Sequence, residues 1–357
     1  MSPARTPPEQ RRFWTWLWWR LFALVGGAVI VGATVGLWFF VPFWVIVAAV
    51  VSTRVPGRWR PLRLFWLLLL HLTLESLVLL SLLGLWLGSG LGLLIRRPFF
   101  QWCHYDVMHW YLRNLFRESM RVLRLRIVTA GPTPDAFPGD PLIVLSRHAG
   151  PGDSFTIVHA LMDTYRREPR IVLKNTLMWE PTVGILMHRL PSRFVQPNPR
   201  PGHDLRSQIG MLARALDEDD VLLIFPEGGN FTAARRLRAI TRLRDLGLEQ
   251  MAARAEQWTH VLAPRPGGVV AALEGAPGVD VLLCAHTGLE HLRTAADIWR
   301  ELPMDKTLTL RWWRVPRARI PRDPDGIADW LYAEWSRIDA WIASQPPSDS
   351  QPPRDSR

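Results

Sequence analysis

Cysteine and lysine are scarce in this chain of 357 residues, and one long stretch carries no charge at all. The two cysteines, Cys103 and Cys284, lie far apart and form no paired spacing. That usage argues against a disulfide framework, favours a reducing compartment and predicts no zinc site. Lysine occurs only at Lys174 and Lys306, so the formal net charge of +11 comes almost entirely from arginine. We see no internal repeat.

Two stretches of the N-terminal third are almost free of charge. Residues 21–51 contain no charged side chain, and residues 64–95 are interrupted only by His71 and Glu75. Each exceeds the ~20 residues that cross the hydrocarbon core once, but neither comfortably holds two full spans with a turn. These runs favour an anionic membrane surface over nucleic acid as the partner of the positive charge. A cleaved signal peptide is disfavoured, because the first run is too long and no small-residue cleavage site precedes Arg54.

Arginines flank the two apolar runs in three groups, within residues 5–20, 54–63 and 96–97. Two simple spans would place the central group on the far side of the membrane, against the positive-inside rule. Two re-entrant or tilted hairpins would keep all three groups on the cytoplasmic face; a two-span hairpin with both termini cytoplasmic is the alternative. Either arrangement leaves residues 98–345 on the cytoplasmic side. We expect His71 and Glu75, four apart on one helix face, to pair with each other or to lie in the interface.

A short apolar strand is predicted over residues 141–146 and leads into His148. The chain then passes through Gly150-Pro151-Gly152, and we expect a helix to begin with Asp153 or Ser154 as its N-cap. Across so tight a turn the Asp153 carboxylate can hydrogen-bond one imidazole nitrogen of His148, which leaves the other nitrogen free to take a proton. A strand-to-helix turn with a plain Asp cap is the alternative interpretation of this pattern alone.

A second apolar strand, predicted over residues 221–225, ends in Pro226-Glu227-Gly228-Gly229-Asn230. Open α/β sheets bind their ligands at the carboxyl ends of the strands. Two strands that each end in a polar, glycine-rich loop therefore predict one site that combines both loops.

With both loops in view, the chain resembles the glycerophospholipid acyltransferase family, typified by 1-acylglycerol-3-phosphate O-acyltransferase. The family's His-x4-Asp motif is matched by His148 and Asp153, and its Phe-Pro-Glu-Gly motif by residues 225–228. Two weaker blocks also occur in the family's order: Lys174-Asn175-Thr176-Leu177 with Glu180-Pro181 and Gly184, and Val261-Leu262-Ala263-Pro264 before Arg265. The resemblance covers roughly residues 121–310.

The resemblance implies transfer of a fatty acyl group from acyl-CoA or acyl-carrier protein to the hydroxyl of a lysophosphatidate or a related lysophospholipid. His148 is expected to act as the general base and Asp153 to fix its tautomer, with neither a metal nor a bound cofactor. Backbone N–H groups after the glycines or at the following helix N-terminus are the candidate donors to the tetrahedral oxyanion. Glu227 and Gly228 are expected to shape the acceptor site.

Two departures from the family pattern leave the acceptor open. Arg147 stands where the family often has Asn, and Gly229-Asn230 stand where it often has Thr-Arg, whose arginine contacts phosphate. Glycerol 3-phosphate is therefore an alternative acceptor. Four basic residues are candidates for the missing phosphate contact: Lys174, Arg235, Arg236 and Arg265.

Two further functions stay open beside acyl transfer. A metal-dependent membrane hydrolase would use His148, Asp153 and Glu227 as ligands, and the lack of a His-x3-His cluster counts against it. A non-catalytic membrane adaptor would bind anionic lipid through a basic face, and the paired motifs count against it.

Alternation of short apolar strands with helical segments predicts an α/β fold, with a mostly parallel central sheet flanked by helices and preceded by a hydrophobic, membrane-embedded helical region. Strands are expected over residues 141–146, 170–173, 221–225, 261–263 and 280–285, with an edge strand over 307–313 and a closing helix over 327–344. The predicted divisions are a basic segment (1–20), a membrane-embedded helical hairpin region (21–97), a connector helix (98–130), the acyltransferase domain (131–344) and a disordered tail (345–357).

Overall fold

The computed structural model describes residues 8–55, 57, 59–131, 139–150, 152–195, 205–288 and 295–345. The chain divides into two compact units, one formed by residues 1–115 and 173–198, the other by residues 116–172 and 199–357. The predicted tail, apart from Gln345, lies outside the described residues, as does the start of the basic segment.

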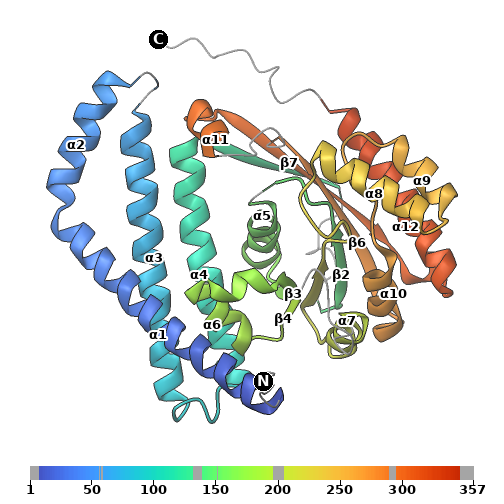
Figure 1. Cartoon of the computed structure of the whole chain (residues 1–357), viewed down its shortest axis with the longest axis horizontal. Helices are drawn as coiled ribbons and strands as arrows, with labels where there is room; N and C mark the ends of the chain where they lie inside the picture. Colours follow the sequence, from blue (N-terminus) through green and yellow to red (C-terminus); the bar gives the residue numbers. More distant parts are fainter. Residues whose placement is uncertain are drawn as a thin grey trace, which may run out of the picture. The chain divides into compact units, whose positions relative to one another are not determined.

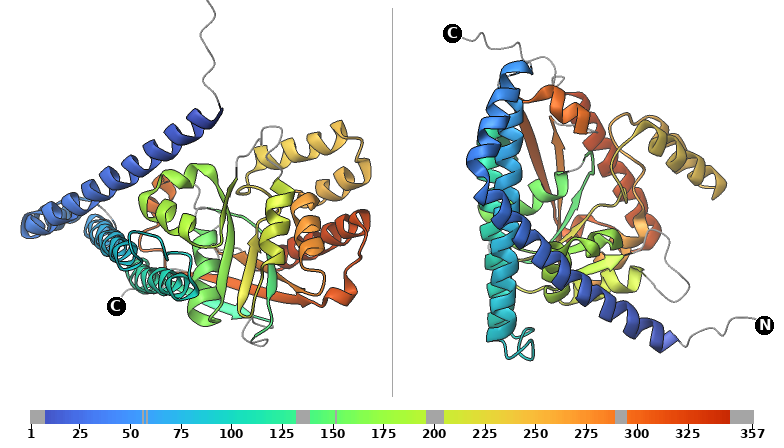
Figure 2. Two further views of the ribbon diagram at one scale, coloured as in Figure 1. Left: turned by 90° about the horizontal axis from the view of Figure 1, so that it is seen from below. Right: turned by 60° about the vertical axis from the view of Figure 1, so that its left-hand side comes forward.

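The first unit is mainly helical. It contains α1 (Pro8–Phe39), α2 (Val41–Arg54), α3 (Arg60–Gly88), most of α4 (Pro98–Leu123), α6 (Pro181–Arg189), a 3₁₀ turn (Asn175–Trp179) and the short strand β4 (Arg193–Val195). The first apolar run is broken at Phe40, and Pro42 lies in the first turn of α2, where its missing N–H costs no helical bond. The long blue helix in Figure 2 is α1.

Two of these helices are long and apolar enough to cross a membrane: Phe22–Phe39 within α1, and α3. α2 is apolar but shorter. Hydroxyl groups link α1 to α3, since Ser76 Oγ donates to Thr34 Oγ1 over 2.8 Å and Trp38 Nε1 donates to Thr73 Oγ1 over 2.9 Å. Interhelical hydrogen bonds of this kind hold apolar helices together where burial alone does not.

Glu75 of α3 is buried, but its partner is not the expected His71. Its carboxylate accepts hydrogen bonds from Tyr111 of α4, over 2.9 Å, and from Thr182 of α6. The spacing along one helix identifies neighbours on that helix only, so it did not reveal these partners from α4 and α6. The carboxyl of Glu180, the N-cap of α6, has its pKa raised to about 7 by burial and by the negative charge of Glu75.

The second unit is built on a sheet of mainly parallel strands. The seven strands follow the order β1-β7-β6-β2-β5-β3-β4, and β6 and β7 are antiparallel. The strands other than β4 are β1 (Leu125–Ala130), β2 (Leu142–Ser146), β3 (Glu168–Lys174), β5 (Asp220–Ile224), β6 (Asp280–Thr287) and β7 (Lys306–Val315). The predicted α/β class is confirmed.

Three expectations about individual segments are wrong. The helix predicted over residues 98–130 ends at Leu123, because Arg124 takes a left-handed φ of 55° and the alternating run from Leu125 forms β1. β7 is consequently not an edge strand, since β1 pairs with its outer side. Residues 261–263 are buried but form a loop instead of a strand.

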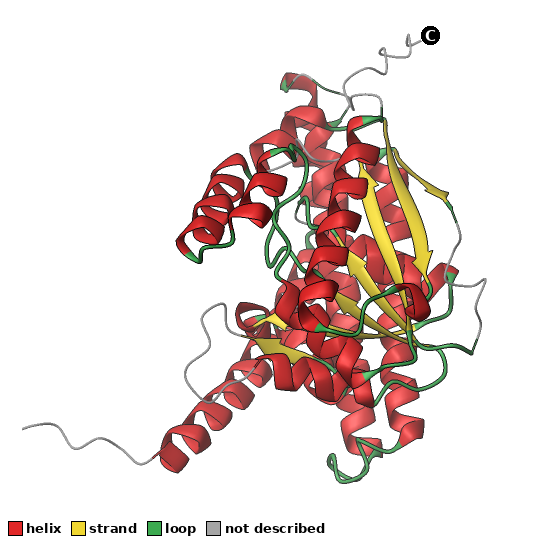
Figure 3. Cartoon of the chain, turned by 90° about the vertical axis from the view of Figure 1, so that its right-hand side faces the viewer, coloured by secondary structure: helices red, strands yellow, loops and turns green. Residues whose placement is uncertain are grey.

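Helices cover both faces of the sheet (Figures 1 and 3). One face carries α5 (Asp153–His159), which continues into one π-helical turn (Ala160–Thr164). The remaining helical segments of this unit are α7 (Leu205–Arg214), α8 (Ala233–Asp245), α9 (Glu249–Glu256), α10 (Pro266–Gly275), α11 (Ala295–Glu301), a 3₁₀ turn (Arg317–Arg319) and α12 (Pro324–Ala343).

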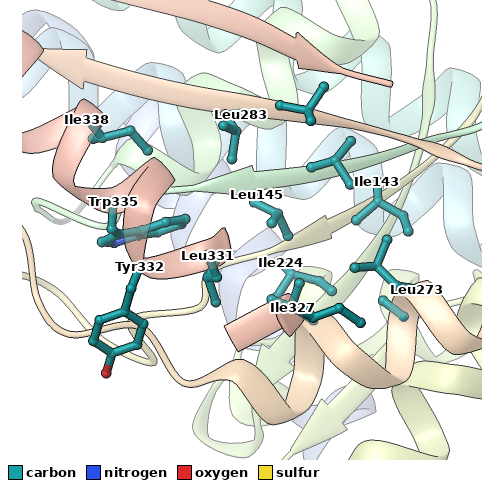
Figure 4. Close-up of a cluster of buried hydrophobic side chains, with 14 of the residues drawn as sticks. Ile143, Leu145, Ile224, Leu273, Leu283, Ile327, Leu331, Tyr332, Trp335 and Ile338 are labelled. Atoms are coloured by element: carbon teal, nitrogen blue, oxygen red, sulfur yellow. The ribbon is translucent and has the colours of Figure 1, made fainter. Parts of the chain in front are cut away.

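Alternate side chains of the central strands pack against α10 and α12 (Figure 4). Ile143 and Leu145 of β2, Ile224 of β5 and Leu283 of β6 meet Leu331 of α12 in this cluster. All five residues of β2 and of β5 are buried, as expected for parallel strands covered on both faces. Burial of each such aliphatic side chain contributes about 1.5–3 kcal/mol, which fixes the rigid strands whose ends carry the polar loops.

The closing helix is confirmed and begins slightly earlier than expected. The Asp323 side chain caps α12 by accepting the Gly326 N–H over 2.7 Å, and Pro324 occupies the first turn. The buried face of α12 carries Trp335 to the end of β5, beside the Phe-Pro-Glu-Gly loop.

Candidate active site

The loop that follows β2 turns back on itself before α5 begins. Gly152 is the N-cap of α5 and has a φ of 117°, a left-handed conformation that glycine adopts without strain. The sequence predicts Asp153 or Ser154 as the N-cap, but neither side chain caps the helix. The Oδ2 atom of Asp153 instead accepts the N–H groups of Ala149, over 2.6 Å, and of Gly150, over 2.5 Å. The carboxylate is thereby fixed to the two residues that directly follow His148.

His148 and Asp153 are brought together as the motif predicts. The Nδ1 atom of His148 lies 3.7 Å from Asp153 Oδ2, which is close enough for electrostatic attraction but too long for a hydrogen bond. Because Nδ1 faces the carboxylate, Nε2 is the nitrogen that remains for a proton taken from elsewhere. The His148 side chain is 15% exposed, so the ring is partly accessible.

The loop after β5 supports His148. The ring of Phe225 lies against the imidazole, with 4.9 Å between centroids and a tilt of 37°. The Phe231 N–H donates to the carbonyl of His148 over 2.7 Å. Strands β2 and β5 are paired in register, with Leu145 opposite Ile224, so their two loops emerge side by side. The prediction that the two motifs form one site is therefore consistent with the geometry of this unit.

A second imidazole, which the sequence analysis did not single out, faces the same carboxylate. His286 lies on β6, the other neighbour of β2, and is 3% exposed. Its Nε2 atom is 3.6 Å from Asp153 Oδ2 and 3.3 Å from the carbonyl oxygen of Arg147. Only the pairing of β2 with β6 brings His286 here, and nothing in the spacing of the two histidines indicates that pairing.

These groups keep Asp153 ionised. Burial by itself raises the pKa of a carboxyl group, but the charge of His286, the His148 imidazole and the Gly150 N–H outweigh it. Together they lower the pKa of Asp153 to about 2. A fixed anion beside His148 favours the imidazolium that forms when the ring accepts a proton.

Glu227 lies beneath the site and is 4% exposed. Its Oε1 atom accepts the indole N–H of Trp335 over 3.2 Å, and Oε2 has no hydrogen-bond partner within the described part of the chain. Burial raises the pKa of Glu227 to about 8, although the charge of Arg147, the indole and the N–H groups of His148 and Leu262 act in the opposite direction. The carboxyl connects the two site loops and the residues before α10 with α12.

Arg147 is almost fully buried, with 1% exposure. Its guanidinium donates to the carbonyl oxygens of His286, over 2.7 Å, and of His260, over 3.1 Å. The arginine that departs from the family pattern therefore contacts backbone carbonyls behind His148.

The basic candidates for phosphate binding occupy different settings. Arg265 is exposed beside Gly228: a Cβ on that glycine would lie 3.5 Å from the guanidinium carbon. The backbone N–H of Arg265 donates to the Pro226 carbonyl over 2.9 Å. Partial burial and the charge of Arg242 lower the pKa of the Arg265 guanidinium. Arg235 is also exposed and donates to the Asn230 carbonyl over 3.0 Å. Both arginines thus border the Phe-Pro-Glu-Gly loop.

The other two candidates have different surroundings. Arg236 donates to the carbonyls of Trp258, over 2.5 Å, and Glu256, over 2.6 Å, and so ties α8 to the end of α9. The two helices, yellow in Figure 2, form a hairpin. Lys174 is exposed at the end of β3 and belongs to the first unit.

Within the described residues, no group of three or more His, Cys, Asp and Glu side chains is arranged to hold a metal ion. Of the three residues considered as metal ligands for a hydrolase, Glu227 is buried and accepts a hydrogen bond from Trp335.

Comparisons with known proteins show what this chain is similar to. A family model described as Acyltransferase matches residues 127–279, which contain both motifs. An uncharacterized acyltransferase of Schizosaccharomyces pombe is 24% identical over 183 residues, covering 48% of this chain. The chain spans about half the length of that curated relative, since the match covers 50% of it.

A solved structure has a similar fold. It is the crystal structure of the 1-acyl-sn-glycerophosphate (LPA) acyltransferase, PlsC, from Thermotoga maritima, with a TM-score of 0.50 and 15% sequence identity. The similarity covers 80% of this chain and 99% of that protein, so it includes more than the central sheet.

Proposed function

We propose that this chain, as a member of the glycerophospholipid acyltransferase family, transfers a fatty acyl group from an acyl thioester to the free hydroxyl of a lysophosphatidate or related lysophospholipid. The donor is acyl-CoA or acyl-carrier protein. The observation that carries the proposal is the pairing of a partly accessible His148 with the buried, ionised Asp153, on a loop joined to the Phe-Pro-Glu-Gly loop.

His148 serves as the general base in this proposal. The acceptor oxygen attacks the thioester carbonyl carbon while its proton passes to Nε2 of His148. The tetrahedral intermediate then collapses, the carbon–sulfur bond breaks, and the imidazolium returns the proton to the leaving thiolate. The negative charge of Asp153 favours a proton on Nδ1, which leaves Nε2 to act as the base, and it stabilises the imidazolium. The acceptor is itself the nucleophile, so no covalent acyl-enzyme is needed.

The acceptor's phosphate is assigned to the arginines that border the Phe-Pro-Glu-Gly loop. Arg265 and Arg235 are exposed there, and a guanidinium offers paired N–H donors that match phosphate oxygens. Glu227 and Gly228 shape this loop: the carboxyl bonds to Trp335 and the glycine takes a φ of 69°.

We further propose that the chain is anchored in a membrane through α1 and α3, with the second unit, which carries His148 and Asp153, on the cytoplasmic side. The apolar length of these two helices and the arginine groups within residues 5–20 and 96–97, which two spans leave on the same side as the second unit, support this placement. A lysophospholipid is itself a membrane component, so an anchored enzyme meets its acceptor at the bilayer surface.

The test is an acyl-transfer assay on the purified full-length protein in detergent. Radiolabelled acyl-CoA is offered with lysophosphatidate, other lysophospholipids and glycerol 3-phosphate, and products are separated by chromatography. We expect transfer to a lysophospholipid, and we expect His148→Ala to lower kcat by about 10²–10⁴-fold, the contribution of a positioned base. His159→Gln is the matched control, because His159 lies at the end of α5 and stacks on Phe116.

Melting temperatures of the variants separate a catalytic loss from misfolding. Turnover by a folded His148→Ala variant at the wild-type rate would refute the assigned base. Transfer to glycerol 3-phosphate alone would correct the acceptor, and no transfer to any acceptor by the wild type would overturn the proposed function.

A further inference from the structure

Asp153 has an imidazole on two sides. His148 approaches from the loop after β2, and His286 approaches from β6 at 3.6 Å. The same Nε2 atom of His286 lies 3.3 Å from the carbonyl oxygen of Arg147. That carbonyl belongs to the peptide unit that leads directly into His148, so His286 faces both the orienting carboxylate and the backbone of the base.

We propose that His286 is a positioning residue of the active site: its Nε2–H donates to the carbonyl of the peptide before His148 and attracts the Asp153 carboxylate, which keeps the two in fixed relation. The inference deepens the proposed function and rests on it for its kinetic consequence. The structural part, an imidazole Nε2–H that faces two acceptors, stands on the geometry alone.

The surroundings of Nε2 define its protonation. A backbone carbonyl and a carboxylate oxygen both accept hydrogen bonds and carry no proton to donate, so the nitrogen that faces them must be the protonated one. The charged and titratable groups near the carboxylate come from three segments: His148 and Arg147 before α5, Asp153 itself, and Cys284 with His286 on β6. Burial raises the pKa of the Cys284 thiol, so that group stays neutral.

The side chain of His286 is separable from the fold around it. The bond from Arg147 goes to the backbone carbonyl of His286, and the pairing of β6 with β7 sets Leu310 opposite its Cα. Both features survive a change of the side chain. A substitution at His286 therefore removes the Nε2 contacts while leaving strand pairing and the buried guanidinium in place.

The consequence of losing that donor falls on His148. Two loop N–H groups still hold one oxygen of Asp153, and the Ser146 hydroxyl still donates to the Arg147 carbonyl over 3.0 Å. The carboxylate and the Arg147–His148 peptide nevertheless lose the imidazole that faces both of them from β6. Displacement of a catalytic group by about 1 Å costs up to about 10²-fold in rate. Substrate contacts are untouched, so the loss belongs in kcat and not in KM.

The first arm of the experiment is kinetic and uses the full-length protein. His286→Leu removes the donor at similar volume, whereas His286→Gln places an amide N–H where Nε2 was. We expect His286→Leu to lower kcat by about 10- to 100-fold with KM unchanged, and His286→Gln to restore kcat to within about threefold of the wild type. Equal losses in both variants, or a loss confined to KM, would overturn the assignment.

A double-mutant cycle shows whether the effect runs through the carboxylate. In an Asp153→Asn background, His286→Leu should lower kcat by less than about threefold, because the effects of substituting residues that act as one unit are strongly non-additive. If His286→Leu lowers kcat by the same factor in both backgrounds, action through Asp153 is refuted. Melting temperatures confirm that each variant is folded.

The second arm needs no activity. In protein labelled with ¹⁵N-histidine, NMR spectra assign His286 by comparison with His286→Gln. We expect Nε2 to carry a proton at neutral pH, and we expect its ¹⁵N shift to change in Asp153→Asn. A ring without a proton on Nε2, or one that does not respond to Asp153→Asn, would overturn the proposal even if the wild type proves inactive. Failure of the proposed function would instead show as a correct NMR signature with no acyl transfer.

Discussion

Glu227 offers a test of whether a buried carboxyl next to a buried arginine is ionised. Burial favours the neutral acid and raises its pKa to about 8, although the charge of Arg147 opposes this. The alternative is a buried ion pair, in which the carboxylate neutralises Arg147. The substitution Glu227→Gln distinguishes the two, because glutamine imitates the protonated acid and keeps an oxygen for the Trp335 indole.

The magnitude follows from proton linkage. The pKa of Glu227 is about 8 in the folded protein and 4.5 in its unperturbed state, so between these values the folded state holds a proton that the unfolded state has lost. Stability of the wild type therefore falls as pH rises through this window. At pH 7 the accumulated cost is roughly 3 kcal/mol, from about 1.4 kcal/mol per pH unit. Glutamine does not titrate and avoids this cost.

The assay is thermal unfolding in detergent between pH 5 and pH 8. Near pH 5 the wild type and Glu227→Gln should melt together. At pH 7 we expect the variant to melt about 5 °C higher, with a gap that widens toward pH 8. Glu218→Gln, at an exposed turn, is the control and should show no such trend. A variant less stable than the wild type, by a margin that grows with pH, would mean that Glu227 is ionised and paired with Arg147, and the reasoning would be wrong.

Two further substitutions separate a substrate contact from a structural one among the arginines near the site. Arg265→Ala should raise the KM for a phosphate-bearing acceptor by about 10- to 100-fold with little change in stability, the loss of one charge-assisted contact; an unchanged KM in steady-state assays would remove Arg265 from the acceptor site. Arg236→Ala should lower the free energy of unfolding by roughly 1–3 kcal/mol, since it abolishes the bonds to Trp258 and Glu256, while KM stays constant; a raised KM at unchanged stability would return Arg236 to the phosphate site.

The sequence predicted those elements whose pattern is local. β2, β5 and α12 lie close to their expected positions, because an uninterrupted apolar run bounded by turn residues is distinctive of a buried strand. β1 was missed, since its alternation follows directly on a helix and resembles more of the same helix. Its omission also led to the misplacement of β7 at the edge of the sheet.

The candidate site divides in the same way. His148 and Asp153 are five residues apart, so one turn brings them together and their spacing predicts their contact. Glu227 required the pairing of β2 with β5, which the family resemblance supplied. His286 and Trp335 required knowledge of which strand and which helix flank the loops, and no property of either residue along the chain reveals that neighbour.

The two carboxyl groups of the site show why neighbours decide chemistry. Asp153 and Glu227 are both buried and both follow a central strand, yet the pKa of one is lowered to about 2 and that of the other is raised to about 8. Asp153 has two imidazoles and two N–H groups converging on a single oxygen, whereas Glu227 has an oxygen without a partner within the described residues. The same functional group, a carboxyl, thus favours the anion where a base must be oriented and the neutral acid where two loops are held to a helix. Both carboxyl groups are buried, so the groups that donate hydrogen bonds to them set the difference between their pKa values. Removing a donor from Asp153 should therefore raise its pKa more than burying its carboxyl more deeply would.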